Sequence, residues 1–400
     1  MYQHIAVAVD NSEHSRYAEE LAVSLARKFQ ADLTGYHIYS GMLHRMRFQA
    51  LEEYLPPRYR KEEVLEYQRK VHSVLIERGL EIISTEYLKR LRDACRQENV
   101  PFREVVTDGK RSDLLCEATA GHDLMVIGAQ GIGRADGAGR LGSTSERVVR
   151  SASCDVLVAR DPRPPRNILV GIDGSEASFA ALGRAREIGE RYRSGLTLLA
   201  AHNPLLHRSV FHLLSGVLSR EAGSVFRFQE QEQLHTAIID QSLEDLYRRH
   251  LEKGAAETEK GGLQACIRLA TGAPWQALCT CAEETGCDLV VVGRYGMHRG
   301  RFDPIGSNAS RVADRVPVNV LIVGGAGQRL PEGAVPEPAA VPAGEQPALV
   351  WTPEAKERLG NVPPFARPMA MLGIERYARE NGIATITPGV MDEARKKFGL

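Results

Sequence analysis

The chain has 400 residues, of which 51 are basic and 51 acidic, and this balance favours neither nucleic acid nor an acidic membrane surface as a partner. No run approaches the roughly 20 apolar residues that span a bilayer, and the sequence opens without a charged and then apolar leader. Seven cysteines without regular CxxC spacing argue against a zinc site. Together these features predict a soluble, cytoplasmic protein with reduced thiols.

Strands and helices alternate through the first half of the chain. The apolar runs predict strands at Ile5–Val9, Leu33–Tyr39, Phe102–Val106, Leu124–Gly128 and Val156–Ala159. Helical patterns lie between them, at Glu13–Phe29, about Glu81–Glu98, Ser112–Ala120 and from Ser143. This alternation predicts a parallel sheet with helices on both faces and right-handed crossovers.

The second half repeats this order from Asn167 to Gly324. The pairs Asp10 with Asp173 and Asp123 with Asp288 keep nearly constant spacing, so we interpret the chain as a tandem duplication. Since 400 residues exceed one typical core, we predict two α/β domains, each with a doubly wound sheet, at residues 1–162 and 165–324.

Two segments, 40–79 and 204–254, are longer than normal connections and are interpreted as additions to the core. Their methionines and histidines leave open a soft-metal or haem site, and the apolar stretch Val210–Leu218 leaves open a membrane-surface helix. The residues concerned are Met42, His44, Met46, His207 and His212. We favour helices that bury an apolar face on a partner or on the other domain.

After the second domain the composition changes. Residues 325–348 are rich in Pro, Ala, Gly and Glu, as expected of a solvated linker. In the last segment, 349–400, Thr352-Pro353-Glu354 and Thr387-Pro388 are helix-start signals, and a second helix ends at Asn381-Gly382. Three short helices bury little surface, so we interpret this small module as an adaptor for a partner.

Glycine-rich turns carry the chemistry. In the second half Gly293-x-x-Gly296 is followed after nine residues by Gly306-Ser307, and in the first half Gly128-x-x-Gly131 is followed after ten by Gly142-Ser143-Thr144. Backbone amides in such turns and at the following helix N-terminus bind phosphate. Compensating charge is expected from nearby arginines. They are Arg134, Arg140, Arg294, Arg299 and Arg301.

Asp10 and Asp173 end their first strands, beside the switch point where open parallel sheets bind ligands. There a carboxylate accepts a hydrogen bond from ribose or helps hold a metal on the phosphates. The alternative is structural, because parallel sheets use glycine in strand-to-helix turns for its dihedrals alone. Neither loop is a Walker P-loop or a GxGxxG dinucleotide turn. The combination of Asp, Gly-x-x-Gly and Gly-Ser in both halves favours a nucleotide site.

These residues resemble the universal stress protein family. The resemblance rests on Val7-Ala8-Val9-Asp10-Asn11-Ser12-Glu13, Ile172-Asp173-Gly174-Ser175-Glu176, Leu141-Gly142-Ser143-Thr144 and the Gly-x-x-Gly turns. It implies the adenine nucleotide alpha hydrolase-like fold, with strand order 3-2-1-4-5 in each half and the halves paired within the chain. It also implies that ATP, AMP or ADP binds, with Mg²⁺ as an accompanying ion. By this resemblance Asp10 and Asp173 contact the nucleotide and Ile38 lines the adenine pocket, with Asn203 as the counterpart of Ile38.

The last 50 residues are similar to the small C-terminal domain of the light-independent protochlorophyllide reductase B subunit. The similar stretches are Trp351-Thr352-Pro353-Glu354, Pro363-Pro364-Phe365 and Ile374-Glu375-Arg376-Tyr377. The body of that enzyme has no counterpart here, so reductase activity is not implied.

No residue is an evident general base, so we predict a nucleotide-binding stress-response regulator or sensor that hydrolyses ATP slowly at most. The alternative is an ATP-independent scaffold whose C-terminal module docks on a redox or tetrapyrrole enzyme. A homodimer or a protein partner held through that module is left open.

Overall fold

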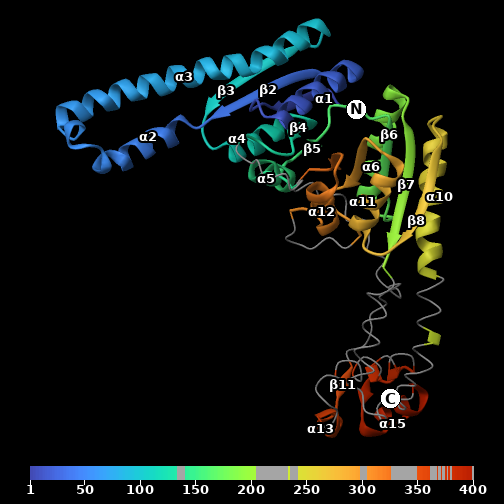
Figure 1. The fold of residues 1–400 in the computed structure, drawn as a ribbon. Helices are drawn as coiled ribbons and strands as arrows, with labels where there is room; N and C mark the ends of the chain where they lie inside the picture. Colours follow the sequence, from blue (N-terminus) through green and yellow to red (C-terminus); the bar gives the residue numbers. More distant parts are fainter. Residues whose placement is uncertain are drawn as a thin grey trace. The chain divides into compact units, whose positions relative to one another are not determined.

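The computed structural model describes residues 1–132, 140–203, 233–234, 242–297, 304–325, 349–360 and 381–398, with 367, 371, 374–375 and 377–378. The first half contains β1 (His4–Ala8), α1 (Glu13–Phe29), β2 (Asp32–Tyr39), α2 (Gly41–Leu51), α3 (Glu62–Gln97), β3 (Phe102–Asp108), α4 (Arg111–Ala118), β4 (Leu124–Gly128), α5 (Ser143–Ser151) and β5 (Asp155–Ala159). The second half contains β6 (Asn167–Gly171), α6 (Glu176–Tyr192), β7 (Gly195–His202), α10 (Leu243–Lys260), β8 (Ala265–Thr271), α11 (Pro274–Thr285), β9 (Leu289–Gly293), α12 (Ser307–Arg315) and β10 (Asn319–Val323). Figure 1 shows these elements in place.

The strands form one ten-stranded sheet in the order β3-β2-β1-β4-β5-β10-β9-β6-β7-β8. The predicted order 3-2-1-4-5 is confirmed in each half, and every pair within a half is parallel. The halves meet where β5 pairs with β10 in antiparallel register, with Leu157 beside Leu321. We call this the β5–β10 seam. It makes the two predicted sheets continuous.

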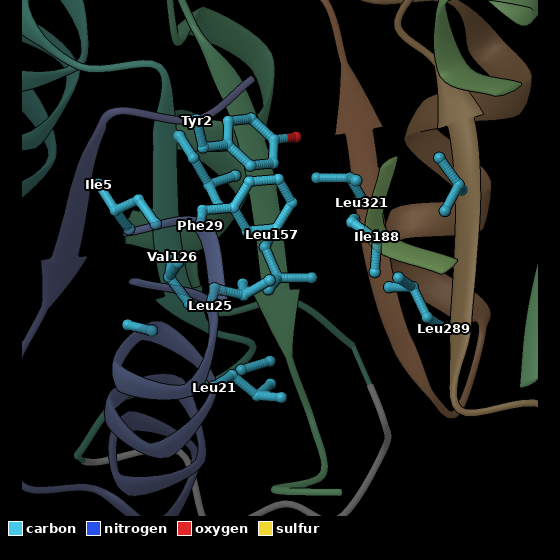
Figure 2. Packing of buried hydrophobic residues seen from close by; sticks show 14 of the residues in the cluster. Tyr2, Ile5, Leu21, Leu25, Phe29, Val126, Leu157, Ile188, Leu289 and Leu321 are labelled. Carbon is cyan, nitrogen blue, oxygen red and sulfur yellow. The ribbon is translucent and has the colours of Figure 1, made fainter. Parts of the chain in front are cut away.

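Apolar residues cover both faces of the sheet because the strands alternate buried side chains between two clusters. One cluster packs α1, α3, α6 and α10 against residues such as Val7 and Val170. The other packs α4, α5, α11 and α12 against residues such as Ala6 and Leu169. Figure 2 shows Phe29 and Leu157 of the first half beside Leu321 of the second. Each of the two clusters contains residues of both halves, so the halves share their hydrophobic core.

Polar groups at the seam are paired across the two halves. Asp155 accepts a hydrogen bond across the seam from the Gly324 amide (2.8 Å), and one within its own half from the Tyr2 hydroxyl (2.8 Å). The Asn319 side chain, at the matching place on β10, accepts from the amides of Arg160 (2.8 Å) and Asp161 (3.1 Å). Since buried polar groups must be hydrogen-bonded to avoid a desolvation cost, these contacts fix the register of the seam.

The first insertion differs from expectation. The helix predicted at about 81–98 is the end of a single 36-residue helix, α3, which runs from Glu62 to Gln97. The part before residue 80 forms a hairpin with α2, which Figure 1 shows beyond the edge of the sheet. Phe48 stacks on His72 with ring centroids 4.4 Å apart. Met42 and Met46 are exposed, and no group of three or more metal-ligating side chains occurs among the described residues.

The C-terminal module has its own small core, made of residues such as Ala355, Ile374 and Ala394. Helix α13 (Pro353–Gly360) begins where predicted, and the Thr352 hydroxyl caps it by accepting from the Ala355 amide (3.3 Å). Helix α15 (Pro388–Phe398) is the predicted third helix, and the described residues 374–375 and 377–378 are helical. The sequence did not predict the two-stranded parallel sheet of β11 (Val350–Trp351) and β12 (Thr385–Ile386).

Several predicted features lie outside the described residues. These are the linker after Gly325, most of the second insertion with Val210–Leu218, His207 and His212, and the Pro363-Pro364 stop. In the part of the chain that the structure describes, none of the helices has the length and apolar content of a membrane span.

Candidate functional site

A cavity of about 520 Å³ opens at the carboxyl ends of β1, β2 and β4, against the N-terminus of α5. It brings together all seven residues that the sequence nominated in the first half. They are Asp10, Ile38, Gly128, Gly131, Gly142, Ser143 and Thr144. The carboxyl edge of a parallel sheet, at the point where the strand order reverses, is where such folds bind ligands.

The Asp10 carboxylate links two loops that form the cavity wall. One oxygen, Oδ1, accepts from the Ser12 amide (3.0 Å), and Oδ2 accepts from the Ile132 amide (3.1 Å). A Cβ at Gly131 would lie 2.5 Å from Oδ2, so only glycine allows this approach. Asp10 thus holds the glycine loop against the turn that follows β1, whether or not it touches a ligand.

The remaining glycines differ in what they need from their surroundings. A Cβ at Gly128 would lie 2.7 Å from the backbone of His14, so glycine is required for β4 to pack on α1. At Gly142 the nearest atoms would be 3.6 Å away, which is ordinary contact, and its φ of −68° suits any residue. Among the described residues, therefore, nothing blocks a Cβ at position 142.

The N-terminus of α5 faces the cavity, which is lined by Ser143, Thr144 and Ser145 of its first turn. Gly142 is the cap residue and offers no side-chain hydrogen bond, while its carbonyl accepts from the Glu146 amide (2.8 Å). The first amides of a helix have no intrahelical acceptor, and the helix dipole adds positive potential there. The Ser145 hydroxyl instead donates inward to the Gly128 carbonyl (2.7 Å). This end of the cavity suits an anion.

The opposite end of the cavity is apolar. Ile38 is joined there by three side chains that the sequence did not predict as site residues. They are Tyr36, Leu115 and Ile127. Arg111, the first residue of α4, also lines the cavity and donates from Nε to the Ile38 carbonyl (3.1 Å). No motif marks these residues, which come together only because the fold packs α4 against β2 and β4.

The second half repeats the same construction. Asp173 Oδ1 accepts from the Ser175 amide (3.0 Å), and Oδ2 accepts from the Met297 amide (3.2 Å). Cβ atoms would lie 2.6 Å from Asp173 Oδ2 at Gly296 and 2.7 Å from the Ala177 backbone at Gly293. Gly306 caps α12 and Ser307 is its first residue.

The strand register corrects one expected correspondence. Tyr36 lies beside Ala8 in the first half, and Leu199 lies beside Gly171 in the second. Two residues further on, the counterpart of Ile38 is therefore Ala201, and the assignment to Asn203 was wrong. The first residue of α4, Arg111, likewise has proline as its counterpart at the start of α11. The two apolar ends thus differ in size and charge.

Arg294 does not supply charge to a ligand, contrary to expectation. Its side chain is fully buried, and Nη1 donates to the Val149 carbonyl (2.6 Å) at the end of α5. Its Nε donates to the Gly324 carbonyl, and burial lowers its pKa. Arg294 therefore caps a helix of the other half. Arg140 is exposed, and Arg134, Arg299 and Arg301 lie outside the described residues.

The buried side chain of Glu19 connects the cavity wall to α3. The Ser15 hydroxyl, on the cavity wall, accepts from the Asp10 amide (3.0 Å) and donates to Glu19 Oε1 (3.3 Å). Glu19 is buried, and its Oε2 lies 3.2 Å from Nε of Arg90 on α3. Burial raises the pKa of Glu19 despite the arginine. Leu182 occupies the matching position of α6.

Comparison with known proteins agrees with this architecture. The model of the universal stress protein family matches residues 1–160 and 165–324. A universal stress protein of Mycobacterium tuberculosis is 30% identical over 158 residues, which are 40% of this chain and 95% of that protein. The crystal structure of a universal stress protein from Archaeoglobus fulgidus superposes with a TM-score of 0.50 at 15% identity, over 80% of this chain and 98% of that one. At that identity the superposition shows the fold alone.

The C-terminal module matches a different family, described as the proto-chlorophyllide reductase 57 kD subunit, over residues 351–395. In Chlorobium phaeobacteroides, the B subunit of the light-independent protochlorophyllide reductase is 41% identical over 69 residues. That stretch is 17% of this chain and only 13% of the reductase polypeptide.

Proposed function

The chain belongs to the universal stress protein family, and from that premise we propose that its first half binds an adenine nucleotide in the cavity around Asp10. The ligand is ATP, AMP or ADP, with Mg²⁺ on the phosphates where ATP is bound. Through this site the protein acts as a stress-response regulator or sensor in the cytoplasm. We propose a binding role rather than catalysis.

The observation that carries the proposal is Gly142. Because the protein leaves room for a Cβ at this position, the glycine is best explained by a ligand that approaches the backbone closely. Gly142 lines the cavity beside Ser143 and Thr144, where the first amides of α5 suit phosphate oxygens. In this proposal the apolar end around Ile38 receives the base and Asp10 contacts the ribose.

In the second half, Asp173, Gly293, Gly296, Gly306 and Ser307 would hold a nucleotide in the same way. The matching hydrogen bonds of Asp173 support this extension. The change from Ile38 to Ala201 and the loss of Arg111 alter the base end of that site. We therefore expect the two sites to differ in affinity.

The test is titration calorimetry of the full chain with Mg-ATP and with AMP, together with analysis of small molecules released on denaturation. The Gly142→Ala variant should bind at least tenfold more weakly, since its methyl group occupies the path of the phosphates, while its melting temperature without ligand stays unchanged. Gly306→Ala is the equivalent variant of the second half, although a Cβ there would lie 3.2 Å from the Arg294 carbonyl oxygen. If the natural protein neither carries nor binds adenine nucleotide, the proposal is wrong.

A second candidate function is an ATP-independent scaffold. The C-terminal module favours it, because this module has its own core and matches a domain found in a redox enzyme. Under this proposal the module docks on a redox or tetrapyrrole-related protein. Retained capture of such a partner by the Gly142→Ala variant would separate docking from nucleotide binding.

A further inference from the structure

The long helix α3 carries a row of apolar side chains that face solvent. Five residues form this outer stripe. They are Tyr67, Val71, Val74, Leu75 and Ile82. Each is between 43% and 65% exposed. At the helical repeat they fall within a sector of about 100°, which is the width of a packed helix face.

The other side of the same helix is already occupied. Helix α2 packs there, with Phe48 on His72, and its C-terminal end is tied to α3 by an ion pair between Glu52 and Arg69 (2.7 Å). Helix α2 runs along one side of α3 (Figure 1), and the residues of the outer stripe are exposed, so α2 leaves the stripe uncovered. Contiguous apolar rows of this kind mark interaction surfaces rather than ordinary exposed residues.

We propose that the outer stripe pairs with the same stripe of a second copy, with the two α3 helices antiparallel. A twofold axis between Val74 and Leu75 places each of these residues opposite the other in the second copy. The same axis places Tyr67 opposite Ile82 of the second copy, and Val71 opposite the stem of Arg78. The stripe is thus complementary to itself, as a closed twofold interface requires.

The charges beside the stripe select this direction. Lys70 and Glu81 are both exposed and lie along the same edge of the stripe. In the antiparallel arrangement Lys70 of one copy lies near Glu81 of the other, and the pair occurs twice. In a parallel arrangement about a twofold axis along the helices, the two copies present this edge on opposite sides of the contact, so Lys70 of one copy and Glu81 of the other do not meet.

The size of the stripe sets the strength of the contact. Two such stripes with their flanking side chains bury roughly 1,000 Å² in total, which is at the low end for specific interfaces. We therefore expect a reversible dimer that forms as concentration rises. This pairing is independent of nucleotide binding.

The test is sedimentation velocity of the full chain over a concentration series up to about 100 μM, a range that detects micromolar dimers. Ile82→Glu should weaken dimerisation at least tenfold. Ile83→Glu is the matched control, because Ile83 is the same residue type on the same helix, is 42% exposed and lies outside the stripe. Circular dichroism checks that both variants keep their helix content.

Charge exchange tests the pairing itself. Lys70→Glu should weaken the dimer, and adding Glu81→Lys should restore it. Spin labels at position 67 should lie at least about 22 Å apart along the helices, from 15 residues at 1.5 Å each, whereas labels at position 75 should be close. A protein that stays monomeric, a dimer insensitive to Ile82→Glu, or a short distance between labels at 67 would each overturn the proposal. Binding of the C-terminal module or of a foreign protein to the stripe would do so too.

Discussion

The glycines around the cavity are required for different physical reasons. Gly128 and Gly131 are fixed by the protein, because their missing Cβ atoms make room for the His14 backbone and the Asp10 carboxylate. Gly142 is not constrained in this way. A motif that reads as one signal in the sequence therefore divides into packing residues and a residue best explained by a ligand.

This division predicts opposite effects on stability. Gly128→Ala should lower the free energy of unfolding by about 1–3 kcal/mol, because the added methyl overlaps backbone atoms that cannot move aside easily. Gly142→Ala should change it by less than about 0.5 kcal/mol. Urea unfolding of both variants without ligand makes the comparison, and equal losses would contradict this interpretation of the cavity.

Glu19 gives a prediction that depends on pH. Its pKa is raised in the folded protein, so the fold binds this proton more tightly than the unfolded chain does. Its contribution to stability is complete below the unfolded value of about 4.3 and is lost as pH rises through the raised folded pKa. The natural protein should therefore lose stability relative to Glu19→Gln over this range, which urea unfolding at stepped pH would measure.

In the second half, the position on α6 that corresponds to Glu19 is occupied by the apolar residue Leu182. The partner Arg90 is 46% exposed and also pairs with Glu20, so it is not left as an uncompensated buried charge when Glu19 is replaced. Glu19→Leu should therefore leave the unfolding free energy unchanged or raise it by up to about 1 kcal/mol, because a buried acid that costs desolvation is removed. If Glu19 positions Ser15, the same variant should bind nucleotide more weakly. An unchanged nucleotide affinity, measured by calorimetry, would show that Glu19 does not influence nucleotide binding through Ser15.

At the scale of elements, α3 joins a domain helix to an external hairpin without a break. Its C-terminal part packs Leu88 and Leu91 in the core, whereas its N-terminal part contacts α2 on one side and solvent on the other. Gly79 lies between these parts, and no atom would contact a Cβ there within 4 Å. The helix is therefore continuous across a residue that favours helix weakly.

Gly79→Ala should stabilise this junction by about 0.5–1 kcal/mol, because alanine loses less backbone entropy in a helix and meets no obstacle. We expect slower amide hydrogen exchange in residues 62–80 and little change in the sheet. Faster exchange in the hairpin would mean that the glycine accommodates a bend that the alanine disrupts.

The sequence predicted the strands better than this helix. Helices cover both faces of the parallel sheet, so nearly every residue of a strand is buried, as Ile5 and Val126 are. The resulting apolar runs are a strong local signal for strands. The many charged residues between 62 and 80 obscured the fact that α3 is one continuous helix. They are frequent there because only one narrow face of this part packs on α2. Likewise the motif residues of the cavity were found, but Tyr36 and Arg111 were missed, because they reach the cavity from β2 and α4 and belong to no motif. The role of Arg294 was predicted wrongly because a charged residue in a glycine turn gives no sign that it is buried.

At the scale of the whole molecule, the β5–β10 seam makes one folding unit of two halves. Leu157 and Leu321 are buried there, and α1 and α6 contribute to one shared cluster. The loop before α5 also reaches across, with the Leu141 amide donating to Asp314 of α12 (3.1 Å). We expect a single cooperative unfolding transition for residues 1–324.

Separating the halves should expose β5 and β10 as unpaired edge strands. Residues 1–162 produced alone should self-associate or, when mixed with 165–324, form a stable complex. Light scattering and native mass spectrometry would identify these species. A monomeric, fully stable first half would mean that the seam contributes little to its stability.

Covalent fusion at this seam has an evolutionary consequence. In an assembly of two identical chains, every substitution is introduced twice and must be tolerated in both places. In a single fused chain, each half can change alone while still supplying its edge strand to the other. The differences between Ile38 and Ala201 and between Glu19 and Leu182 are of this kind. The first half can therefore change in ligand recognition while the second half continues to pair with it through β10.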